Sequence, residues 1–387
     1  MKWKFYSLAF VAGMSILTAC SSDDNNDNGG NGNGNEIENG TILKGTITSD
    51  VTLAAGNTYK LSGEYIVEEG ATLHIEEGVK IIAVYDDIAD YILVKQGGKI
   101  NAVGTPDKPI VMTSEKEEPG AWGGIHICGR AHTNAEGGKG SSEIGGAVYG
   151  GNDDADNSGT LQYIRLEYTG FAFDEEHEAN GISFYGVGNG TIVDHCQAYK
   201  GSDDGFEFFG GSVNVSNLVA VSCSDDSFDW TEGWNGKGTN LVAYQEAEST
   251  LGYDCDCLME CDNNGSNNAA TPVAHPVLKN LILVGNGGSK QGIRLRAGTE
   301  VEIDNAKVCG KGQPLTVETA LTENALKNGT SKLTNITLTS ELSSKEGIYT
   351  HADFIAVTSN KVDANLSYSS FEDIRKECSW MNGSWVK

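Results

Sequence analysis

The chain carries an internal repeat with a short period. Ser-Asp-Asp at 202–204 returns at 224–226, and an aromatic-acid-aromatic triplet follows both copies. Apolar strand signals recur around these copies, and the shortest steps between them are 22 residues (195 to 217), 23 (217 to 240) and 25 (280 to 305). A repeat of this length predicts a solenoid in which each repeat forms one coil.

The repeated segments have the character of β-strands. They are short and apolar, and no long segment of helical periodicity separates them, so we expect an all-β parallel β-helix solenoid. Its coils should hold about 22–25 residues, with loop insertions where the steps are longer. Fifty glycines and six prolines fit short strands broken at corners. The first polar position of successive signals is Tyr163, His195, Asn217, Asn240, Asn280, Asn305 and Asn335.

This asparagine column has a physical reason. A corner asparagine can hydrogen-bond backbone groups that the bend leaves unpaired. The chain resembles the right-handed parallel β-helices of the pectate-lyase-like superfamily over residues 41–360, in which asparagines stack at one corner. The block DDGFEFFGG…DDSFDW…GW also resembles a family of bacterial surface and secreted β-helix proteins. The resemblance implies a fold and a location rather than a particular reaction.

The two ends of the chain differ from the repeat region. Lys2 and Lys4, a short apolar run and Leu-Thr-Ala-Cys ending at Cys20 predict a lipoprotein signal peptide over residues 1–19. The Gly/Asn/Asp-rich stretch that follows predicts a lipidated cysteine and a flexible surface tether over residues 20–40. Residues 41–387 are expected to form one β-helix domain, with FEDIRKECSWMNGSWVK as a segment capping the solenoid end.

Location and partners are expected from the same features. Leu-Thr-Ala-Cys resembles a bacterial lipobox, and Ser-Ser-Asp-Asp after Cys20 resembles the export signal of surface lipoproteins in the Bacteroides group. The resemblance implies a lipid anchor in the outer membrane and a domain exposed on the cell surface. A net charge of −27 argues against nucleic acid as a partner. The expected partners are outer-membrane lipid at Cys20, a glycan or nutrient ligand, and an outer-membrane transporter.

Eight cysteines beyond Cys20 allow up to four disulfides in an oxidising exterior. Their spacing does not choose a connectivity. Cys255, Cys257 and Cys261 are expected to staple a loop, and a metal cluster is the alternative. The eight are Cys128, Cys196, Cys223, Cys255, Cys257, Cys261, Cys309 and Cys378.

The repeated acids are predicted to stack along one face of the solenoid. Counting from each corner gives an inward column of Phe206, Phe228, Tyr253 and Ile293. Because side chains alternate along a strand, the next column points outward. It reads Ser183, Glu207, Asp229, Asp254 and Arg294. Two residues on, a second outward column reads Tyr185, Phe209, Thr231, Asp256 and Arg296.

Stacked carboxylates repel one another. At the strand spacing of about 4.8 Å and an effective dielectric of 20, each neighbouring pair costs roughly 3 kcal/mol. A sheltered ladder therefore needs a cation or a proton, whereas a solvated one needs neither. The aromatic flank of the second column suggests shelter and favours calcium held by Glu207, Asp229 and Asp254. A solvated acidic face is the alternative.

Two aspartate pairs precede this strand, Asp203-Asp204 and Asp225-Asp226. Aspartate is common at bends because its side chain caps the turn. The functional alternative is that Asp204 and Asp226 extend the calcium site.

The leading functional hypothesis is a binding protein. Aromatic rings beside charged groups are suited to a glycan, which Tyr185, Phe209, Glu207, Asp229 and Asp256 would contact.

Whether the chain is an enzyme stays open at this point. The ladder resembles that of calcium-dependent pectate lyases, with Arg294 or Arg296 as the base. GSDDG and CSDDS resemble the Asp-Asp element of polygalacturonases, but the Gly-His-Gly and Asn-Thr-Asp companions are missing. A structural or adhesive surface rod is the third possibility.

Overall fold

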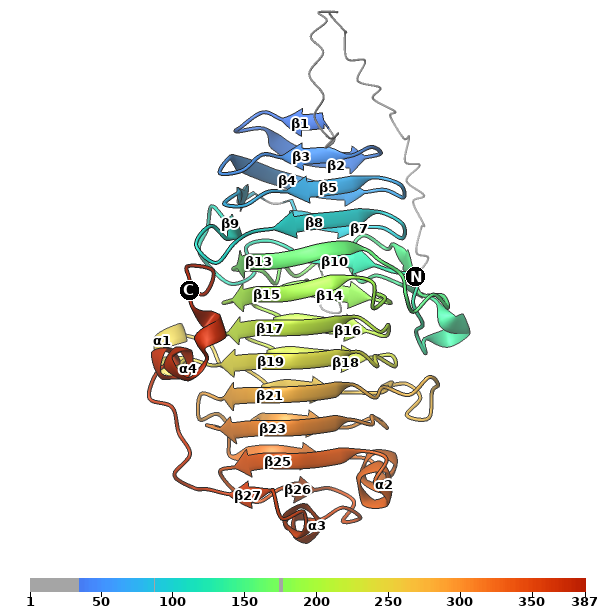
Figure 1. Ribbon diagram of the computed structural model, residues 1–387, viewed down its shortest axis with the longest axis vertical. Coiled ribbons are helices and arrows are strands. Elements are labelled where there is room, and N and C mark those ends of the chain that lie inside the picture. The colour runs from blue at the N-terminus through green and yellow to red at the C-terminus, as the bar shows by residue number, and fades with distance from the viewer. Residues whose placement is uncertain (1–34, 87, 174–176) are drawn as a thin grey trace, which may run out of the picture. The chain divides into compact units, whose positions relative to one another are not determined.

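The computed structural model describes residues 35–86, 88–173 and 177–387. The predicted signal peptide, Cys20 and most of the predicted tether lie outside these residues. Short strands follow one another along the long axis, and each coil pairs in parallel with its neighbours (Figure 1). The prediction of an all-β parallel β-helix is confirmed. The tether prediction was wrong at its end, because Asn35–Ile37 already forms the first strand, paired with Val51–Leu53.

Strands of successive coils stack into three parallel faces. The first face contains β1 (Asn35–Ile37), β3 (Val51–Leu53), β5 (Thr72–Ile75), β8 (Lys99–Val103) and the first halves of β13 (Gly159–Glu167), β15 (Ile192–Tyr199), β17 (Asn214–Val221), β19 (Lys237–Tyr244), β21 (Val277–Val284), β23 (Glu302–Cys309) and β25 (Lys332–Leu338). The second face contains β6 (Lys80–Ala83), β9 (Ile110–Ser114), the first halves of β2 (Ile42–Ile47) and β4 (Thr58–Val67), the second halves of β13 to β25, and β27 (Lys361–Val362).

The third face carries the candidate site, and we call it the ladder face. It begins with the second halves of β2 and β4. It continues through β7 (Tyr91–Val94), β10 (Ile125–Cys128), β14 (Ile182–Tyr185), β16 (Phe206–Phe209), β18 (Phe228–Thr231), β20 (Met259–Cys261), β22 (Gln291–Leu295), β24 (Gln313–Val317) and β26 (Ser343–Ser344).

The corner between the first two faces is the predicted asparagine column. Asn217, Asn240, Asn280 and Asn305 all have φ between 56° and 63°, in the left-handed region that asparagine tolerates better than most residues. Each amide donates to the side chain one coil earlier, at 2.7–3.0 Å. The column therefore works through side-chain bonds between coils as well as through its backbone conformation.

Helices and loops interrupt the coils at few places. The helices are α1 (Glu248–Leu251), α2 (Ala320–Asn328), α3 (His351–Ala356) and α4 (Phe371–Glu377), with 3-10 turns η1 (Glu136–Gly138) and η2 (Ser379–Met381). A small antiparallel hairpin, β11 (Gly140–Ser141) and β12 (Val148–Tyr149), lies in the insertion after β10. Within the described residues, no helix is both long and apolar enough to span a membrane.

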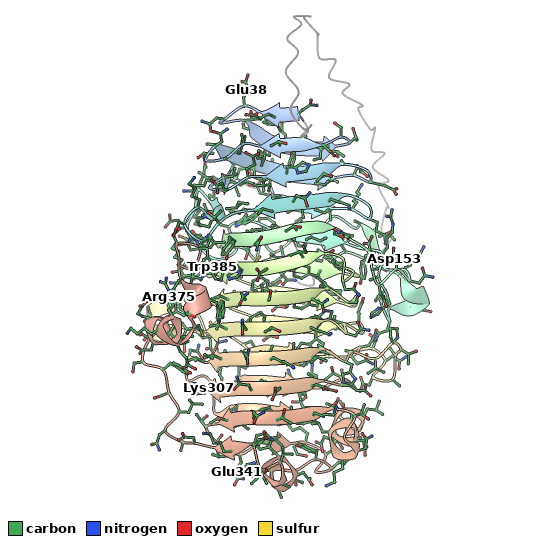
Figure 2. The ribbon with its side chains drawn as sticks, in the orientation of Figure 1. Glu38, Asp153, Lys307, Glu341, Arg375 and Trp385 are labelled. Atoms are coloured by element: carbon green, nitrogen blue, oxygen red, sulfur yellow. The ribbon has the colours of Figure 1, made fainter. Side chains whose placement is uncertain are left out.

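The C-terminal segment was predicted to cap the end of the solenoid, and this is wrong. The chain turns back beyond β27 and lies along the side of the coils, where Figure 2 labels Arg375 and Trp385. Its Trp385 lies with the ring centroid 5.2 Å from that of His195 on β15, in one apolar cluster with outward residues of β17, β19 and β21, including Val219 and Val242. These valines would otherwise face water, which explains why the segment binds the side. The end itself is covered by α3 (Figure 1).

The disulfide prediction is not supported. All eight cysteines beyond Cys20 are buried free thiols in this structure. Cys196, Cys223 and Cys261 belong to the hydrophobic core inside the coils. They act there as small apolar side chains, and the predicted staple at Cys255, Cys257 and Cys261 is absent from the described chain.

Candidate functional site

A polar column runs along the ladder face. Strand register aligns His126 of β10, Ser183 of β14, Glu207 of β16, Asp229 of β18, Glu260 of β20, Arg294 of β22 and Thr316 of β24. The inward neighbours Phe206 and Phe228 are stacked with ring centroids 5.7 Å apart, as predicted. We call the acids at and beside this column the acid ladder, with members Asp204, Glu207, Asp226, Asp229, Glu260 and Asp262.

Three predicted positions in the columns were wrong, those of Tyr253, Asp254 and Asp256. Glu260, not Asp254, pairs with Asp229, and the inward position belongs to Met259 rather than Tyr253. Likewise Asp262 follows Thr231 in the second outward column, because its backbone N–H donates to Trp230 O at 2.8 Å.

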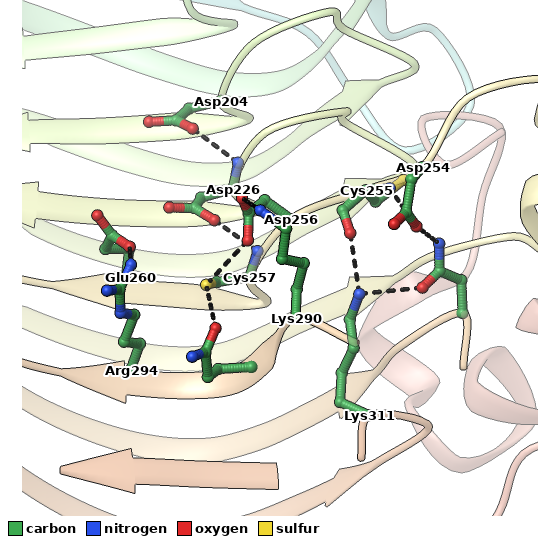
Figure 3. Close-up of polar contacts among 12 residues, drawn as sticks. Asp204, Asp226, Asp254, Cys255, Asp256, Cys257, Glu260, Lys290, Arg294 and Lys311 are labelled. Atoms are coloured by element: carbon green, nitrogen blue, oxygen red, sulfur yellow. Dashed lines mark hydrogen bonds and ion pairs between the residues drawn. The ribbon is translucent and has the colours of Figure 1, made fainter. Parts of the chain in front are cut away.

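Asp254 lies in the insertion that contains α1, apart from the acid ladder (Figure 3). Its carboxylate accepts a hydrogen bond from Asn286 Nδ2 at 2.8 Å. Asp256 lies between Asp254 and the acid ladder (Figure 3) and forms an ion pair with Lys290. Of the two, only Asp256 stays near the ladder, because its carboxylate and that of Asp226 belong to one group of possible metal ligands.

The aromatic flank does not face solvent. Tyr185 is fully buried and Phe209 nearly so, and their rings stack with centroids 4.4 Å apart. The insertion after β10 covers them, with Tyr149 against Tyr185 and Glu143 accepting the Tyr185 hydroxyl hydrogen at 3.2 Å. Direct stacking of a glycan on Tyr185 and Phe209 is therefore contradicted, because the insertion already occupies that surface.

Two of the six acids in the ladder, Glu260 and Asp262, are neutralised by arginine. Arg294 pairs with Glu260 at 2.8 Å and with Glu318 at 3.3 Å. Arg296 pairs with Glu260 and, at 2.7 Å, with Asp262. Each of these carboxylates thus has a cationic neighbour.

These ion pairs also keep Arg294 and Arg296 protonated. Burial alone would lower the pKa of Arg294, but hydrogen bonds and charge from Glu318 and Glu260 outweigh it and raise the pKa above its ordinary value. Arg296 behaves in the same way beside Asp262. Loss of a proton is therefore harder than in water, which opposes a role for either arginine as a base.

The other four acids of the ladder have no such ion pair among the described residues. Asp204, Glu207, Asp226 and Asp229 form no ion pair with a lysine, arginine or histidine in the described part of the chain. The ligand oxygens of Asp204, Glu207 and Asp229 lie within 4.8 Å of one another, and so do those of Asp226, Asp229 and Glu260. Asp229 is common to both groups, and the charge of Arg296 offsets the rise of its pKa only in part.

One aspartate of each pair accepts a backbone hydrogen bond, as expected for aspartate at a bend, but from a different coil than predicted. Asp204 Oδ1 accepts the backbone N–H of Asp226 at 2.8 Å, and Asp226 Oδ1 accepts that of Cys257 at 2.6 Å. Each aspartate therefore caps the next coil rather than its own turn. Both are nearly fully buried, which contradicts the solvated-face alternative for these two residues.

The pKa values reflect this crowding. Burial first, and neighbouring carboxylates second, raise the pKa of Asp204, Glu207, Asp226 and Asp229 well above the ordinary range. The pKa of Asp203, at the edge of the group, rises to about 7 for the same reasons. Without a cation, these carboxyl groups would share protons at neutral pH.

Orphaned polar atoms lie at the same place. Asp229 Oδ1 is buried and has no hydrogen-bond partner among the described residues. Asn180 is fully buried; its Nδ2 donates to Glu207 Oε2 at 2.6 Å, while its Oδ1 has no partner in the described chain. Buried oxygens without donors are costly unless a proton, a water or a cation satisfies them. This oxygen-rich donor set fits a hard cation such as calcium.

A polar cavity of about 680 Å³ adjoins the end of β18. Three segments line it: Asn134–Glu136, the corner Thr231–Glu232, and Asn264–Asn267. Glu232 has φ 53°, although it is not glycine, and its Oε2 accepts hydrogen bonds from Tyr149 and Thr133 at 2.8 and 2.7 Å. A strained, firmly held carboxylate in a cavity is typical of a functional position.

Comparison with known proteins places this geometry in a family. The model of the pectate-lyase like beta helix domain matches residues 45–386. The chain belongs to this family. No curated protein and no solved structure matches it. Membership in the pectate-lyase-like β-helix family supports a carbohydrate-related or surface role at a coarse level.

Sequence reasoning missed several residues of this site in the pectate-lyase-like β-helix. Glu260 and Asp262 repeat the acid-x-acid pattern of Asp254 and Asp256 six positions later. They would have been predicted if the insertion before this strand had been taken as six residues longer. His126 belongs to a coil with no repeat signal of its own, and Asn180 lies just before the predicted column, where no sequence pattern marks it.

Proposed function

We propose that this chain is a lipid-anchored protein of the outer-membrane surface that binds a glycan beside a calcium-loaded acid ladder. One observation carries the proposal: a group of acids with buried oxygens and no cationic partner in the described chain, next to a large polar cavity.

Calcium is the cofactor that this donor set supports. Asp204, Glu207, Asp226 and Asp229 would hold it, all through oxygen. Its charge would relieve a repulsion of roughly 3 kcal/mol for each close carboxylate pair. It would also give Asp229 Oδ1 the partner that this oxygen lacks among the described residues.

The glycan is assigned to the cavity rather than to the predicted aromatic flank. Amide and hydroxyl groups of Asn264, Ser266 and Asn267 line one wall, and Thr231 and Glu232 form the other. Such groups exchange hydrogen bonds with sugar hydroxyls. Thr231 ends the strand that carries Asp229, so a ligand in the cavity lies close to the proposed calcium.

The anchor rests on sequence alone. Cys20 and its flanking residues lie outside the described chain, and the proposal for them is unchanged: a diacylated cysteine, a surface tether and a neighbouring outer-membrane transporter. Cys20→Ala should release the protein from the membrane fraction of cells.

Lyase activity with Arg294 or Arg296 as base has less support than binding. Both arginines are held between carboxylates, and their raised pKa values oppose proton abstraction. Polygalacturonate incubated with the protein and calcium should therefore give no absorbance from unsaturated products. A steady increase that Arg294→Lys abolishes would establish the lyase instead.

A titration with oligosaccharides tests the proposal. Neutral and uronic hexasaccharides would be titrated into the protein by calorimetry, in calcium and in chelator. We expect one of them to bind more tightly in calcium, and Ser266→Gln, which fills the exposed mouth of the cavity, to weaken it at least tenfold. Ala269→Gln, on the same exposed loop but outside the cavity lining, is the matched control. Binding unaffected by Ser266→Gln would refute the assignment to this cavity.

A further inference from the structure

A second groove lies where the C-terminal segment meets the asparagine corner, on faces of the solenoid other than the ladder face. Its volume is about 290 Å³, and Asn240, Asn280 and Asn305 form one wall. Glu377, Ser379 and Trp380 form the opposite wall. Ligand pockets start at about 300 Å³, so the groove has room for roughly one or two sugar rings.

The asparagine wall has hydrogen-bonding capacity left over. Asn280 Nδ2 donates to Asn240 Oδ1 at 3.0 Å, and Asn305 Nδ2 donates to Asn280 Oδ1 at 2.9 Å. A side-chain amide has two N–H donors and two acceptor sites, so Asn240 and Asn280 each keep one of both kinds, and Asn305 keeps one donor and both acceptor sites. Asn280 and Asn305 are exposed, which places these free groups toward the groove and solvent.

The chain of hydrogen bonds along the asparagine column ends at Asn305. The next asparagine of the corner, Asn335, donates to Asp304 Oδ1 at 2.6 Å instead of continuing to Asn305. Asn305 Oδ1 therefore accepts no hydrogen bond from another asparagine of the column. The groove thus holds a row of amides at the coil spacing of about 4.8 Å, with an open acceptor at one end.

Trp380 supplies an aromatic surface. Its side chain is half-buried, and its ring is held by Trp385 and His195, with centroids at 6.2 and 6.4 Å. These contacts fix the ring without covering it completely. A fixed ring beside hydrogen-bonding groups is the usual arrangement for an amphipathic ligand.

The charges in the groove are already balanced. Lys307 Nζ, from the strand side, pairs with Glu377 Oε1 at 2.5 Å. Tyr368 donates to the other oxygen of Glu377 at 2.8 Å. Figure 2 labels Lys307 on the same side of the molecule as Arg375 of the C-terminal segment. A charged ligand would have to break this pair, so the groove favours a neutral one.

We propose that this groove binds a neutral sugar ring of a polysaccharide, with the ring on Trp380 and its hydroxyls on the asparagine wall. The site is separate from the acid ladder and needs no calcium. It would add a second contact to the same chain and so raise the avidity for a long polymer. The inference does not rest on the proposed function of the ladder face.

The test is a titration in chelator with cellohexaose, xylohexaose and maltohexaose, and with hexagalacturonate as the charged comparison. Tryptophan fluorescence and calorimetry report binding. We expect at least one neutral oligosaccharide to bind with a millimolar Kd and to change the fluorescence, and hexagalacturonate to do neither.

Variants locate the site. Ser379→Gln narrows the groove from an exposed position and should weaken neutral binding at least tenfold, whereas Ser367→Gln, exposed on the same segment but outside the groove, should not. Trp380→Phe should remove the fluorescence change while keeping part of the affinity. No neutral binding at millimolar concentrations would overturn the proposal. Binding that Ser266→Gln removes and Ser379→Gln does not would also overturn it, because the sugar would then lie in the other cavity.

Discussion

At the scale of single residues, the corner asparagines show how the sequence encodes a coil. A left-handed backbone conformation costs most residues about 1–2 kcal/mol, and asparagine reduces that cost with a local polar side chain. Asn217 has φ 56°, donates to Asp194 at 2.7 Å and accepts from Asn240 at 2.8 Å. The repeat made this column readable from the sequence, because the same residue type returns once per coil.

Substitution of Asn217 separates the two contributions. Asn217→Gly removes the hydrogen bonds and keeps the backbone conformation accessible, whereas Asn217→Ala also adds backbone strain. We expect the alanine variant to be about 1 kcal/mol less stable than the glycine variant in urea unfolding. Equal stabilities would mean that the backbone conformation contributes nothing at this corner.

Asp229 is the residue on which the calcium account depends. Asp229→Asn removes one negative charge from both groups of acids and keeps the shape of the side chain. In chelator we expect its melting temperature to equal or exceed that of the unmodified chain, because repulsion of roughly 3 kcal/mol per close pair is relieved. In calcium we expect it to be lower, because a ligand is lost.

Asp254→Asn is the matched control for this comparison. Asp254 has the same side chain and lies near the ladder in sequence, but its carboxylate is bound to Asn286 outside the two Asp229 groups. It should leave the calcium-induced shift unchanged. If both variants lost the shift equally, calcium would act on the overall negative charge rather than in the ladder.

At the scale of elements, strand identity was predictable and the register across a long insertion was not. Segments such as SNLVAV and TNLVAY repeat at one-coil steps, and both became strands. The insertion containing α1 holds Asp254-x-Asp256 before Glu260-x-Asp262. The two patterns are equivalent in charge and spacing, so only the length of chain that the insertion absorbs decides between them.

The cover over Tyr185 was hidden from the sequence for a related reason. An outward position on a strand is exposed only if no other segment packs on it. The hairpin β11–β12 contacts the ladder face through Tyr149 and Ile144, far from Tyr185 in the chain. The side-lying C-terminal segment was misjudged in the same way.

The C-terminal segment is expected to depend on Trp385 for its attachment to the side of the coils. Trp385 is fully buried between the segment and the second face. Trp385→Ala should cost about 3–5 kcal/mol of unfolding free energy, measured in guanidinium. The variant should also bind a hydrophobic dye, since a loosened segment exposes the apolar residues of β17 and β19 that share its cluster. A cost under about 1 kcal/mol would mean that the segment detaches readily in solution.

At the scale of the whole molecule, the buried acids predict how stability changes with pH. Folding raises the pKa of Asp203 and, by burial, of Glu143 to about 7, and burial also raises the pKa values of the ladder acids well above their ordinary range. The unfolded chain would lose these protons near pH 4. Between about pH 4 and 7 the folded state therefore binds more protons than the unfolded state, so its stability falls as pH rises.

In chelator, the melting temperature should accordingly decrease from about pH 4 through pH 7 and beyond. In calcium the decrease should be smaller, because the ion binds the deprotonated acids. Asp229→Asn should show a shallower decrease in chelator. Calorimetric scans across this range would check it, and a melting temperature that rises with pH in chelator would show that the acids are not buried as described.

Calorimetric titration of calcium into the metal-free chain at neutral pH tests most directly whether Asp204, Glu207, Asp226 and Asp229 hold calcium. We expect saturable binding with proton release, abolished by Asp229→Asn and retained in Asp254→Asn. Absence of saturable binding, or binding that survives Asp229→Asn unchanged, would contradict a calcium site in the ladder. Shared protons would then be what relieves the repulsion between these carboxylates.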